Sequence, residues 1–235
     1  MFNLFKKKTT FESSGVFRGF IDYHSHILPG VDDGVRKMED SLAILQEYEH
    51  LGIEEVWCTP HIMEDIPNTT SQLRERFAEL QEAYNGTIVL HLAAEYMLDN
   101  LFAERLTARD ILPLDELSHD KILVETSYFN PPFGLMHTLD DIKSKGYYPV
   151  LAHPERYMYM QDENYYKNLK QKGVLFQLNI GSTCGVYGKT AKQKADMLIK
   201  NDFYNYKGTD LHGMDLLQMI RSSRLPDGLR LGYGY

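Results

Sequence analysis

Histidine and carboxylate side chains occur in this sequence at spacings that suit metal binding. The earliest are His24 and His26, which stand in the segment DYHSH at residues 22–26. Residues two apart on an extended backbone point to the same side, so both imidazoles could bind one metal ion. The pair alone does not decide between a metal site and two structural histidines, which need only hydrogen-bonding partners.

Further side chains that could bind metal follow the apolar runs of the chain. In a barrel of parallel strands, every carboxyl end faces the same rim, where catalytic residues collect. We therefore predict that these side chains converge, with Glu95 bridging two ions; the alternative for Glu95 is an acid hydrogen-bonded to amides. Nitrogen and oxygen donors without thiolate favour manganese, iron or zinc over a structural cysteine-type zinc site. The donors are His24, His26, His61, Glu95, Glu125, His153, Asp210 and His212.

Seven short β-rich runs alternate with longer segments of helical periodicity, which indicates βα units around a parallel sheet. Open doubly wound sheets and closed barrels both fit this alternation, and the donors at strand ends favour the barrel. Strands are predicted at residues 20–23, 55–59, 88–94, 121–125, 148–152, 174–180 and 203–208. Amphipathic helices are predicted at residues 38–51, 72–84, 135–145, 163–172 and 190–201.

Composition limits the classes of protein that need to be considered. A chain of 235 residues with 43% hydrophobic side chains suffices for a globular domain. Its formal net charge of −8 argues against nucleic-acid binding, which normally needs a basic surface. Cys58 and Cys184 are too far apart for a CxxC pattern, so we expect a reducing, cytoplasmic setting. No run approaches the roughly 20 apolar residues that span a bilayer, and we expect no transmembrane segment.

The first 18 residues begin with MFNLFKKK and are predicted to form a short mobile extension before a single domain at residues 19–235. This extension lacks the long apolar stretch of a secretory signal. Three lysines after Phe2, Leu4 and Phe5 would add about 3 kcal/mol of attraction to an anionic membrane at best. Recruitment to the inner face of a membrane is therefore the alternative to a frayed tail.

Four motifs occupy the ends of the predicted strands: DYHSHILPGVDDG at residues 22–34, TPH at 59–61, AHPERY at 152–157 and GTDLH at 208–212. With them the chain resembles the PHP (polymerase and histidinol phosphatase) superfamily, specifically the bacterial tyrosine-protein phosphatases of capsular and exopolysaccharide loci. The resemblance covers about residues 20–225. It implies an α/β fold, a distorted seven-stranded (β/α)7 TIM-like barrel, with three divalent metal ions. Mn²⁺ is the first choice, with iron or zinc as alternatives.

The resemblance also implies roles for individual residues. The first ion would be held by His24, His26, Glu95 and Asp210, the second by Glu95, Glu125 and His153, and the third by Asp33, His61 and His212. The residues alone do not distinguish Asp32 from Asp33, and the spacing in the family selects Asp33. Asp210, His212 and Arg156 are expected to act in catalysis.

Arg156, in the segment HPER, matches the phosphate-binding arginine of the family, and a guanidinium fork suits a phosphoryl group. Without the resemblance, a solvated loop charge explains it as well. These phosphatases have a second arginine five residues beyond the final histidine, where this chain has Leu217. Arg221 or Arg224 could reach in from the following helix to replace it.

The loop TSYFNPPFG at residues 126–134 adjoins the predicted rim. Its Tyr128, Phe129 and Phe133 are predicted to bind substrate, since they could receive a phenyl ring such as that of phosphotyrosine. The alternative is a loop that Pro131 and Pro132 merely stiffen.

These features predict a metal-dependent phosphomonoester hydrolase, in which metal ions activate water and Arg156 helps to stabilise the phosphoryl charge. The resemblance implies a phosphotyrosine protein as substrate, namely the tail of a membrane-bound tyrosine kinase of polysaccharide biosynthesis, and allows a homo-oligomer. One alternative is a PHP phosphatase for a small metabolite such as histidinol phosphate. A second is an amidohydrolase, which would need a strand-ending lysine that we do not find. A third is a non-catalytic metal-binding or docking module, which only Leu217 favours.

Overall fold

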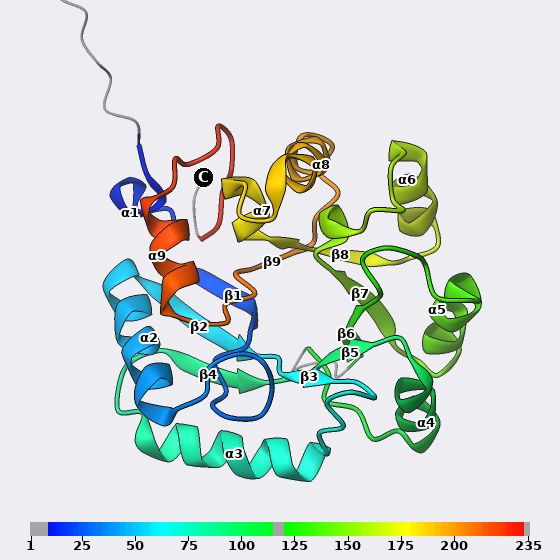
Figure 1. The fold of residues 1–235 in the computed structure, drawn as a ribbon, viewed down its shortest axis with the longest axis horizontal. Coiled ribbons are helices and arrows are strands. Elements are labelled where there is room, and N and C mark those ends of the chain that lie inside the picture. Colours follow the sequence, from blue (N-terminus) through cyan, green and yellow to red (C-terminus); the bar gives the residue numbers. More distant parts are fainter. Residues whose placement is uncertain (1–8, 115–119, 233–235) are drawn as a thin grey trace, which may run out of the picture.

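The computed structural model describes residues 9–114 and 120–232, in which helices surround the strands (Figure 1). The strands are β1 (Phe20–Ser25), β2 (Ile53–Cys58), β3 (His61–Ile62), β4 (Val89–Leu92), β5 (Glu95–Met97), β6 (Lys121–Glu125), β7 (Tyr148–Ala152), β8 (Leu175–Asn179) and β9 (Tyr206–Gly208). The helices are α1 (Phe11–Ser14), α2 (Met38–Leu51), α3 (Thr70–Ala83), α4 (Asn100–Ala108), α5 (Leu135–Ser144), the 3-10 helix η1 (Pro154–Arg156), α6 (Glu163–Gln171), α7 (Ile180–Cys184), α8 (Gly188–Lys200) and α9 (Met214–Ser222).

The strands form two sheets in which every pairing is parallel. The first has the order β1-β2-β4 and the second the order β3-β5-β6-β7-β8-β9. Ile122, Leu123 and Val124 of β6 are all buried, as expected for a parallel strand that is covered on both faces. Ile122 and Val124 pack in the larger apolar core and Leu123 in a smaller one, because side chains alternate along the strand. The predicted α/β class with parallel strands is therefore confirmed.

Two of the predicted strands, at residues 55–59 and 88–94, end early and are followed by separate short strands. Between β2 and β3 the chain contains Pro60, which has no N–H to donate. Its carbonyl oxygen instead accepts a hydrogen bond from the amide of Glu95 at 3.1 Å, and the amide of Ala93 donates to Cys58 at 2.9 Å. The chain passes from the first sheet to the second at this point, which hydrophobic periodicity alone does not reveal.

The residues after β9 lie beside the end of β1. The amide of Asp210 donates to the carbonyl oxygen of His24 at 2.7 Å, and the amide of His26 donates to that of Leu211 at 3.0 Å. Ser25 and Leu211 form an isolated parallel bridge. The carboxyl ends of the first and last strands are thus joined, and the side chains that follow them lie close together.

The five predicted helices are confirmed as α2, α3, α5, α6 and α8, with ends that differ by about two residues at most. The start of α3 is set by a capping box, in which the Thr69 side chain accepts from the Gln72 amide and Gln72 bonds back to Thr69. Sequence periodicity missed α4 and α9. Both helices are short, and each has two buried residues. These are Phe102 and Leu106 in α4, and Leu217 and Ile220 in α9.

Residues 9–18 are packed against the domain, which differs from the predicted mobile extension. Phe11 in α1 and Phe17 after it are buried in the larger core. The amide of Phe11 donates to Ser223 and that of Leu225 to Thr9, so that this segment is bonded to the residues after α9. The basic stretch at residues 6–8 lies outside the described residues.

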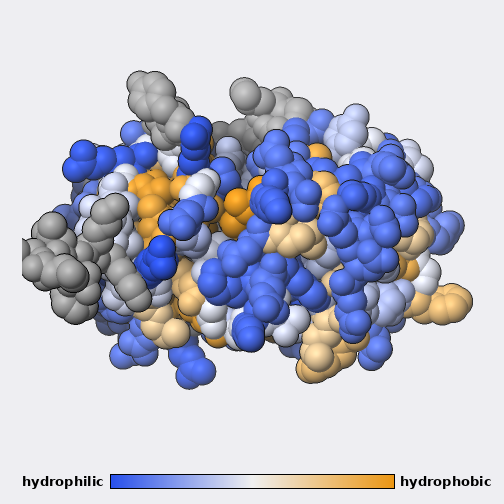
Figure 2. Space-filling model, turned by 90° about the horizontal axis from the view of Figure 1, so that it is seen from above, coloured by the Kyte–Doolittle hydropathy of each residue, from blue (hydrophilic) through white to orange (hydrophobic). Residues whose placement is uncertain are grey.

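The surface carries few contiguous apolar areas on the face shown in Figure 2, where hydrophobic residues form small, separate patches among hydrophilic ones. Within residues 9–114 and 120–232, no helix combines the length and the apolar character needed to cross a membrane.

Candidate metal centre

The predicted metal-binding side chains converge on one cluster at the carboxyl ends of the strands. The cluster contains three groups, and within each group the ligand atoms all lie within 4.8 Å of one another. The groups are His24, His26, Glu95 and Asp210; His61, Glu95 and Glu125; and His26, Asp33, His61 and His212. Glu95 belongs to two of them and is the only carboxylate that does so among the described residues, while His26 and His61 are each shared in the same way.

The first group contains the four residues predicted for the first ion. Nε2 of His24 lies 3.1 Å from Oε2 of Glu95 and 3.4 Å from Oδ1 of Asp210. Nε2 of His26 lies 3.3 Å and 3.2 Å from the same two oxygens. All four side chains are buried, and two buried carboxylates require compensating positive charge. This arrangement could hold a divalent metal ion.

The second group differs from the predicted one in its histidine. Nδ1 of His61 lies 3.1 Å from Oε1 of Glu125, whereas Nε2 of His153 lies 3.9 Å from Oε2 of the same residue. His153 nevertheless approaches Oε1 of Glu95 to 3.0 Å. Both histidines therefore contact the two carboxylates predicted for the second ion.

The third group contains Asp33 and not the adjacent Asp32, and the carboxylate of Asp33 faces two histidines. Its Oδ1 lies 3.6 Å from Nε2 of His61 and 3.5 Å from Nε2 of His212. Asp32 is turned away from these nitrogens: it lies 2.8 Å from Nδ1 of His26 and accepts hydrogen bonds from the amides of His61 and Gly34. Asp32 therefore orients a histidine, and the predicted choice of Asp33 agrees with this geometry.

Two further side chains, Gln177 and Asn179, hold the cluster in place. The sequence patterns did not predict them. The amide oxygen of Gln177 lies 3.0 Å from Nδ1 of His24 and accepts from the amide of His153 at 3.2 Å. Nδ2 of Asn179 donates to Oδ2 of Asp210 at 2.9 Å. Such outer contacts fix the ring orientation of a ligand. The signal that could have revealed them is the presence of two buried amides in the otherwise apolar run VLFQLNI at residues 174–180.

Two of the clustered residues have unusual backbone conformations. His153 has φ 35° and Asp210 has φ 52°, and each follows a strand by no more than two residues. Non-glycine residues in the left-handed region cost about 1–3 kcal/mol and persist where the surroundings hold them. Strain of this kind is typical of functional sites.

The charges in the cluster depend strongly on one another. Burial alone would lower the pKa of His24, but the charges of Glu95 and Asp210 outweigh it and raise the pKa to about 9. Burial alone would raise the pKa of Glu95, but the charges of His24 and His61 hold it well below its usual range. Burial and the charge of Glu95 together raise the pKa of Glu125. The carboxylates are thus compensated by protons on histidines, and metal ions could replace these protons.

Two buried imidazole nitrogens, Nδ1 of His61 and Nδ1 of His153, have no hydrogen-bond partner among the described residues. Glu125 lies within reach of His61, but not in hydrogen-bond geometry. Burial and the charge of Arg156 lower the pKa of His153, which favours the neutral ring that a metal ligand requires. Because buried polar atoms are rarely unsatisfied, this donor set fits divalent metal ions.

Arg156, at the end of η1, lies directly beside the cluster. Its Nη1 donates to Oδ2 of Asp210 at 2.6 Å, which is the only hydrogen bond of its guanidinium among the described residues. The guanidinium carbon lies 4.6 Å from the ring centroid of Tyr128 and 4.0 Å from that of Tyr187, which sequence analysis did not identify. Its side chain is 17% exposed, so the remaining N–H donors could bind an oxyanion.

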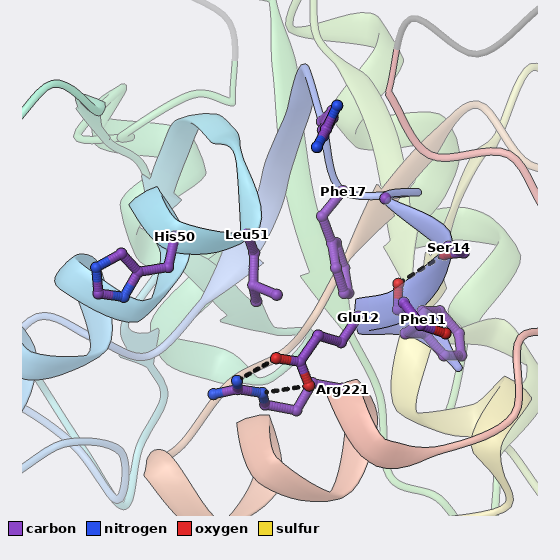
Figure 3. Close-up of a pocket in the computed structure, with 10 residues that line it drawn as sticks. Phe11, Glu12, Ser14, Phe17, His50, Leu51 and Arg221 are labelled. Atoms are coloured by element: carbon purple, nitrogen blue, oxygen red, sulfur yellow. Dashed lines mark hydrogen bonds and ion pairs between the residues drawn. The ribbon is translucent and has the colours of Figure 1, made fainter. Parts of the chain in front are cut away.

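The candidates for a second phosphate-binding arginine lie elsewhere. Leu217 is buried in the core, and Arg224 is exposed and lies 3.6 Å from Asp227. Arg221 pairs with Glu12 in a pocket lined by residues of α1, α2 and α9 (Figure 3). It also pairs with Glu47 of α2 at 2.7 Å. Neither Arg221 nor Arg224 therefore takes the place expected of a second arginine in the cluster.

The loop after β6 brings one of its three predicted aromatic residues to the cluster. The ring of Tyr128 lies 5.7 Å from that of His153, and its carbonyl oxygen accepts from the amide of Met158 at 2.7 Å. Phe129 and Phe133 are instead 69% and 106% exposed. A substrate-binding role for the two phenylalanines stays a prediction.

Comparison with known proteins identifies relatives of this chain. Residues 20–226 match the family described as capsular polysaccharide synthesis, CpsB/CapC. The tyrosine-protein phosphatase YwqE of Bacillus subtilis is 29% identical over 199 residues, which cover 83% of this chain and 78% of that protein. The tyrosine-protein phosphatase CpsB of Streptococcus pneumoniae is 29% identical over 208 residues, with coverage of 83% and 84%. A solved structure from a crystallographic study of YwqE and CpsB, described as metal-dependent tyrosine phosphatases, has a TM-score of 0.76 at 26% identity and covers 87% of this chain and 82% of its own.

Proposed function

This chain belongs to the CpsB/CapC family of capsular polysaccharide synthesis, and from that membership we propose that it is a metal-dependent tyrosine-protein phosphatase. The observation that carries the proposal is the guanidinium of Arg156, hydrogen-bonded to a carboxylate of a cluster that could hold metal ions. A phosphoryl group needs both, because its transfer spreads negative charge over several oxygens. The activity of the relatives, which are tyrosine-protein phosphatases, supports the same conclusion.

We propose three divalent ions, with Mn²⁺ as the first choice and iron or zinc as alternatives. Divalent ions here would supply Lewis acidity, which promotes deprotonation of water near neutral pH. The ligand sets are those that the family implies, with His61 as a further candidate beside Glu95 and Glu125 because of its 3.1 Å approach to Glu125. The proposed ligands are His24, His26, Asp33, His61, Glu95, Glu125, His153, Asp210 and His212.

The protein's own groups bind and orient the substrate. Arg156 donates hydrogen bonds to the phosphoryl oxygens and stabilises the charge that develops on them. Asp210 holds Nη1 of Arg156, and the carbonyl oxygen of Asp210 lies 2.9 Å from Nδ1 of His212, which directs Nε2 of that ring toward Asp33. The phenol ring of the substrate packs against Tyr128, with Phe129 and Phe133 at the outer edge of the same loop.

The tail of a membrane-bound tyrosine kinase of polysaccharide biosynthesis is the proposed substrate. The family description, capsular polysaccharide synthesis, supports this choice. We further propose a cytoplasmic enzyme that meets this kinase at the inner face of the membrane and that can form homo-oligomers. The bonds between the end of β1 and the residues after β9 support closure of the strands into a distorted barrel, which we propose to be of the seven-stranded (β/α)7 type. The proposed phosphoesterase domain spans residues 19–235, and residues 9–18 pack against it.

A metal-dependence assay tests the function. The protein is stripped with a chelator, restored with Mn²⁺, iron or Zn²⁺, and assayed for phosphate release from a phosphotyrosyl peptide and from histidinol phosphate. We expect metal-dependent release that is faster from the peptide. Absence of release from both substrates contradicts an enzyme, and faster release from histidinol phosphate favours a phosphatase for small metabolites.

Two variants separate metal binding from phosphate binding. Replacing Arg156 with Ala should lower turnover about 100- to 1,000-fold, the usual effect of removing one group that stabilises transition-state charge, and leave bound metal unchanged. His153→Ala should lower both turnover and bound metal, measured by atomic emission spectroscopy. Arg224→Ala, at an exposed arginine outside the cluster, is the control and should change neither. Loss of metal from Arg156→Ala would contradict the role given to that arginine.

A further inference from the structure

Tyr187 contacts Arg156 from a part of the chain that none of the sequence motifs covers. It is the residue before α8, and the guanidinium carbon of Arg156 lies 4.0 Å from the centroid of its ring. The second ring on this guanidinium, at 4.6 Å, is that of Tyr128 in the loop after β6. A guanidinium is attracted to aromatic faces, so two rings from separate segments restrain one side chain.

The ring of Tyr187 is itself supported by the start of α7. A Cβ added to Gly181 would lie 3.0 Å from Cε2 of Tyr187 and 3.1 Å from Oδ1 of Asn179, so a side chain at this position would push the ring by a few tenths of an ångström. Asn179 donates to Asp210, the residue that also accepts from Arg156. The support of Tyr187 and the hydrogen bond of Arg156 thus belong to one packed unit.

The orientation of Arg156 matters more here than in a site with two arginines. Leu217 occupies the position of the expected second arginine, and no other arginine within residues 9–114 and 120–232 is paired with a carboxylate of the cluster. An unrestrained arginine side chain loses up to about 2 kcal/mol of rotamer entropy when a ligand orders it. Restraint before binding removes part of this cost.

We propose that Tyr187 is a positioning residue for phosphate binding. Its ring holds the guanidinium of Arg156 so that Nη1 stays on Asp210 and the remaining donors stay available to the phosphoryl oxygens. This inference rests on the proposed function, since it assigns Arg156 to a phosphoryl group.

The affinity of the metal-loaded protein for inorganic phosphate, measured by isothermal titration calorimetry, tests the proposal without turnover. Tyr187→Phe keeps the ring and should bind phosphate as the unchanged protein does. Tyr187→Leu should weaken binding about twofold to thirtyfold, the range expected for loss of one cation–π contact, with bound metal unchanged. Tyr165→Leu, at a half-buried tyrosine of α6 that packs edge-on against Tyr159, is the matched control and should have no effect.

Tyr187→Leu in an Arg156→Ala background distinguishes an effect through Arg156 from a general disturbance of the fold. Tyr187→Leu should then have no further effect on phosphate affinity. An equal loss in both backgrounds, or no loss in the first, overturns the proposal. If Tyr187→Leu does not fold, as judged by circular dichroism, Gly181→Ala displaces the ring instead and should weaken phosphate binding; unchanged affinity in that variant also overturns the proposal.

Chemical modification distinguishes failure of this inference from failure of the proposed function. Phenylglyoxal modification of Arg156, followed by mass spectrometry, should be severalfold faster in Tyr187→Leu, and an unchanged rate contradicts the restraint. If Arg156 is modified faster in Tyr187→Leu but the unchanged protein releases no phosphate from a phosphotyrosyl peptide, only the proposed function is contradicted.

Discussion

Three histidines of the metal cluster have one ring nitrogen held by a nearby oxygen atom. Gln177 holds His24, Asp32 holds His26, and the carbonyl oxygen of Asp210 lies beside His212. With one nitrogen fixed, the other is directed at the carboxylates in the cluster. The carboxylates raise the pKa of His24 and His26, so these two side chains, which can bind metal, also bind protons. Burial and the charge of His26 instead lower the pKa of His212.

We expect metal binding to release protons and to weaken as the pH falls. The pKa of His24 is about 9, because Glu95 and Asp210 outweigh the effect of burial. At pH 7 this ring carries a proton that it must lose to bind metal, so each pH unit below 9 lowers the apparent affinity about tenfold for this proton. Isothermal titration calorimetry in buffers of different ionisation enthalpy measures the release.

His137→Ala on α5 is the control for this experiment, because its side chain is 83% exposed and pairs with Asp141, which does not belong to the cluster. It should leave both proton release and affinity unchanged. An affinity that does not vary between pH 6 and pH 8 would show that the histidines are already neutral before metal binds.

At the scale of the elements, the close approach of β9 to β1 sets the geometry of the cluster. A Cβ on Gly208 would lie 2.5 Å from Cβ of His24 and 2.9 Å from Nε2 of Gln177. Only a residue without a side chain fits between β1 and β8 at this position, and the amide of Asp210 then reaches the carbonyl oxygen of His24.

Gly208→Ala should therefore separate β9 from β1 and lower both metal content and stability. Overpacking of this kind costs about 1–3 kcal/mol, which corresponds to a fall in Tm of roughly 2–12 °C for a domain of this size. Metal analysis and thermal unfolding followed by circular dichroism measure the two effects. Gly213→Ala is the matched control: its Cβ would meet no atom within 4 Å and its φ of 166° is extended. Equal behaviour of the two variants would rule out the proposed constraint.

For the whole molecule, the formal net charge of −8 describes the chain without metal. Glu95, Glu125 and Asp210 are buried in the cluster, and three divalent ions would offset most of the net charge. Bound cations are the largest local charges in a site and would attract a phosphorylated substrate. The acidic composition therefore disfavours nucleic acid as a partner without disfavouring a phosphoprotein.

Metal should stabilise the folded protein, because the ligands come from strands that are distant in sequence and converge only on folding. At a free metal concentration of 100 times Kd the gain is about 2.7 kcal/mol. This corresponds to a rise in Tm of roughly 5–11 °C, which a chelator should reverse. Glu95→Gln, at the carboxylate shared by two groups, should lose most of the rise, whereas His50→Ala on the surface of α2 should retain it. A Tm unaffected by Mn²⁺, iron and Zn²⁺ would contradict a metal centre.

Features that depend on local order along the chain could be predicted from the residues alone. The strands β6 and β7 and the helix α2 have the predicted residues, because apolar periodicity and chain breaks are encoded in neighbouring positions. The donors at strand ends were also identified correctly as neighbours, since parallel strands bring their carboxyl ends to one side. The preference for Asp33 over Asp32 came from the family resemblance, because both acids have the same local context.

Contacts between side chains that are far apart in the chain could not be predicted and became known from the packed fold. Tyr187 lies on Arg156, and Arg221 is paired with Glu12 and Glu47 instead of joining the cluster. No spacing in the sequence encodes these contacts, because each depends on how separate helices and loops pack around the sheets. The passage of the chain between the sheets at Pro60 also depends on tertiary contacts. Hydrogen bonds to a strand that is distant in the chain determine where β2 ends, and the residues around Pro60 do not indicate them.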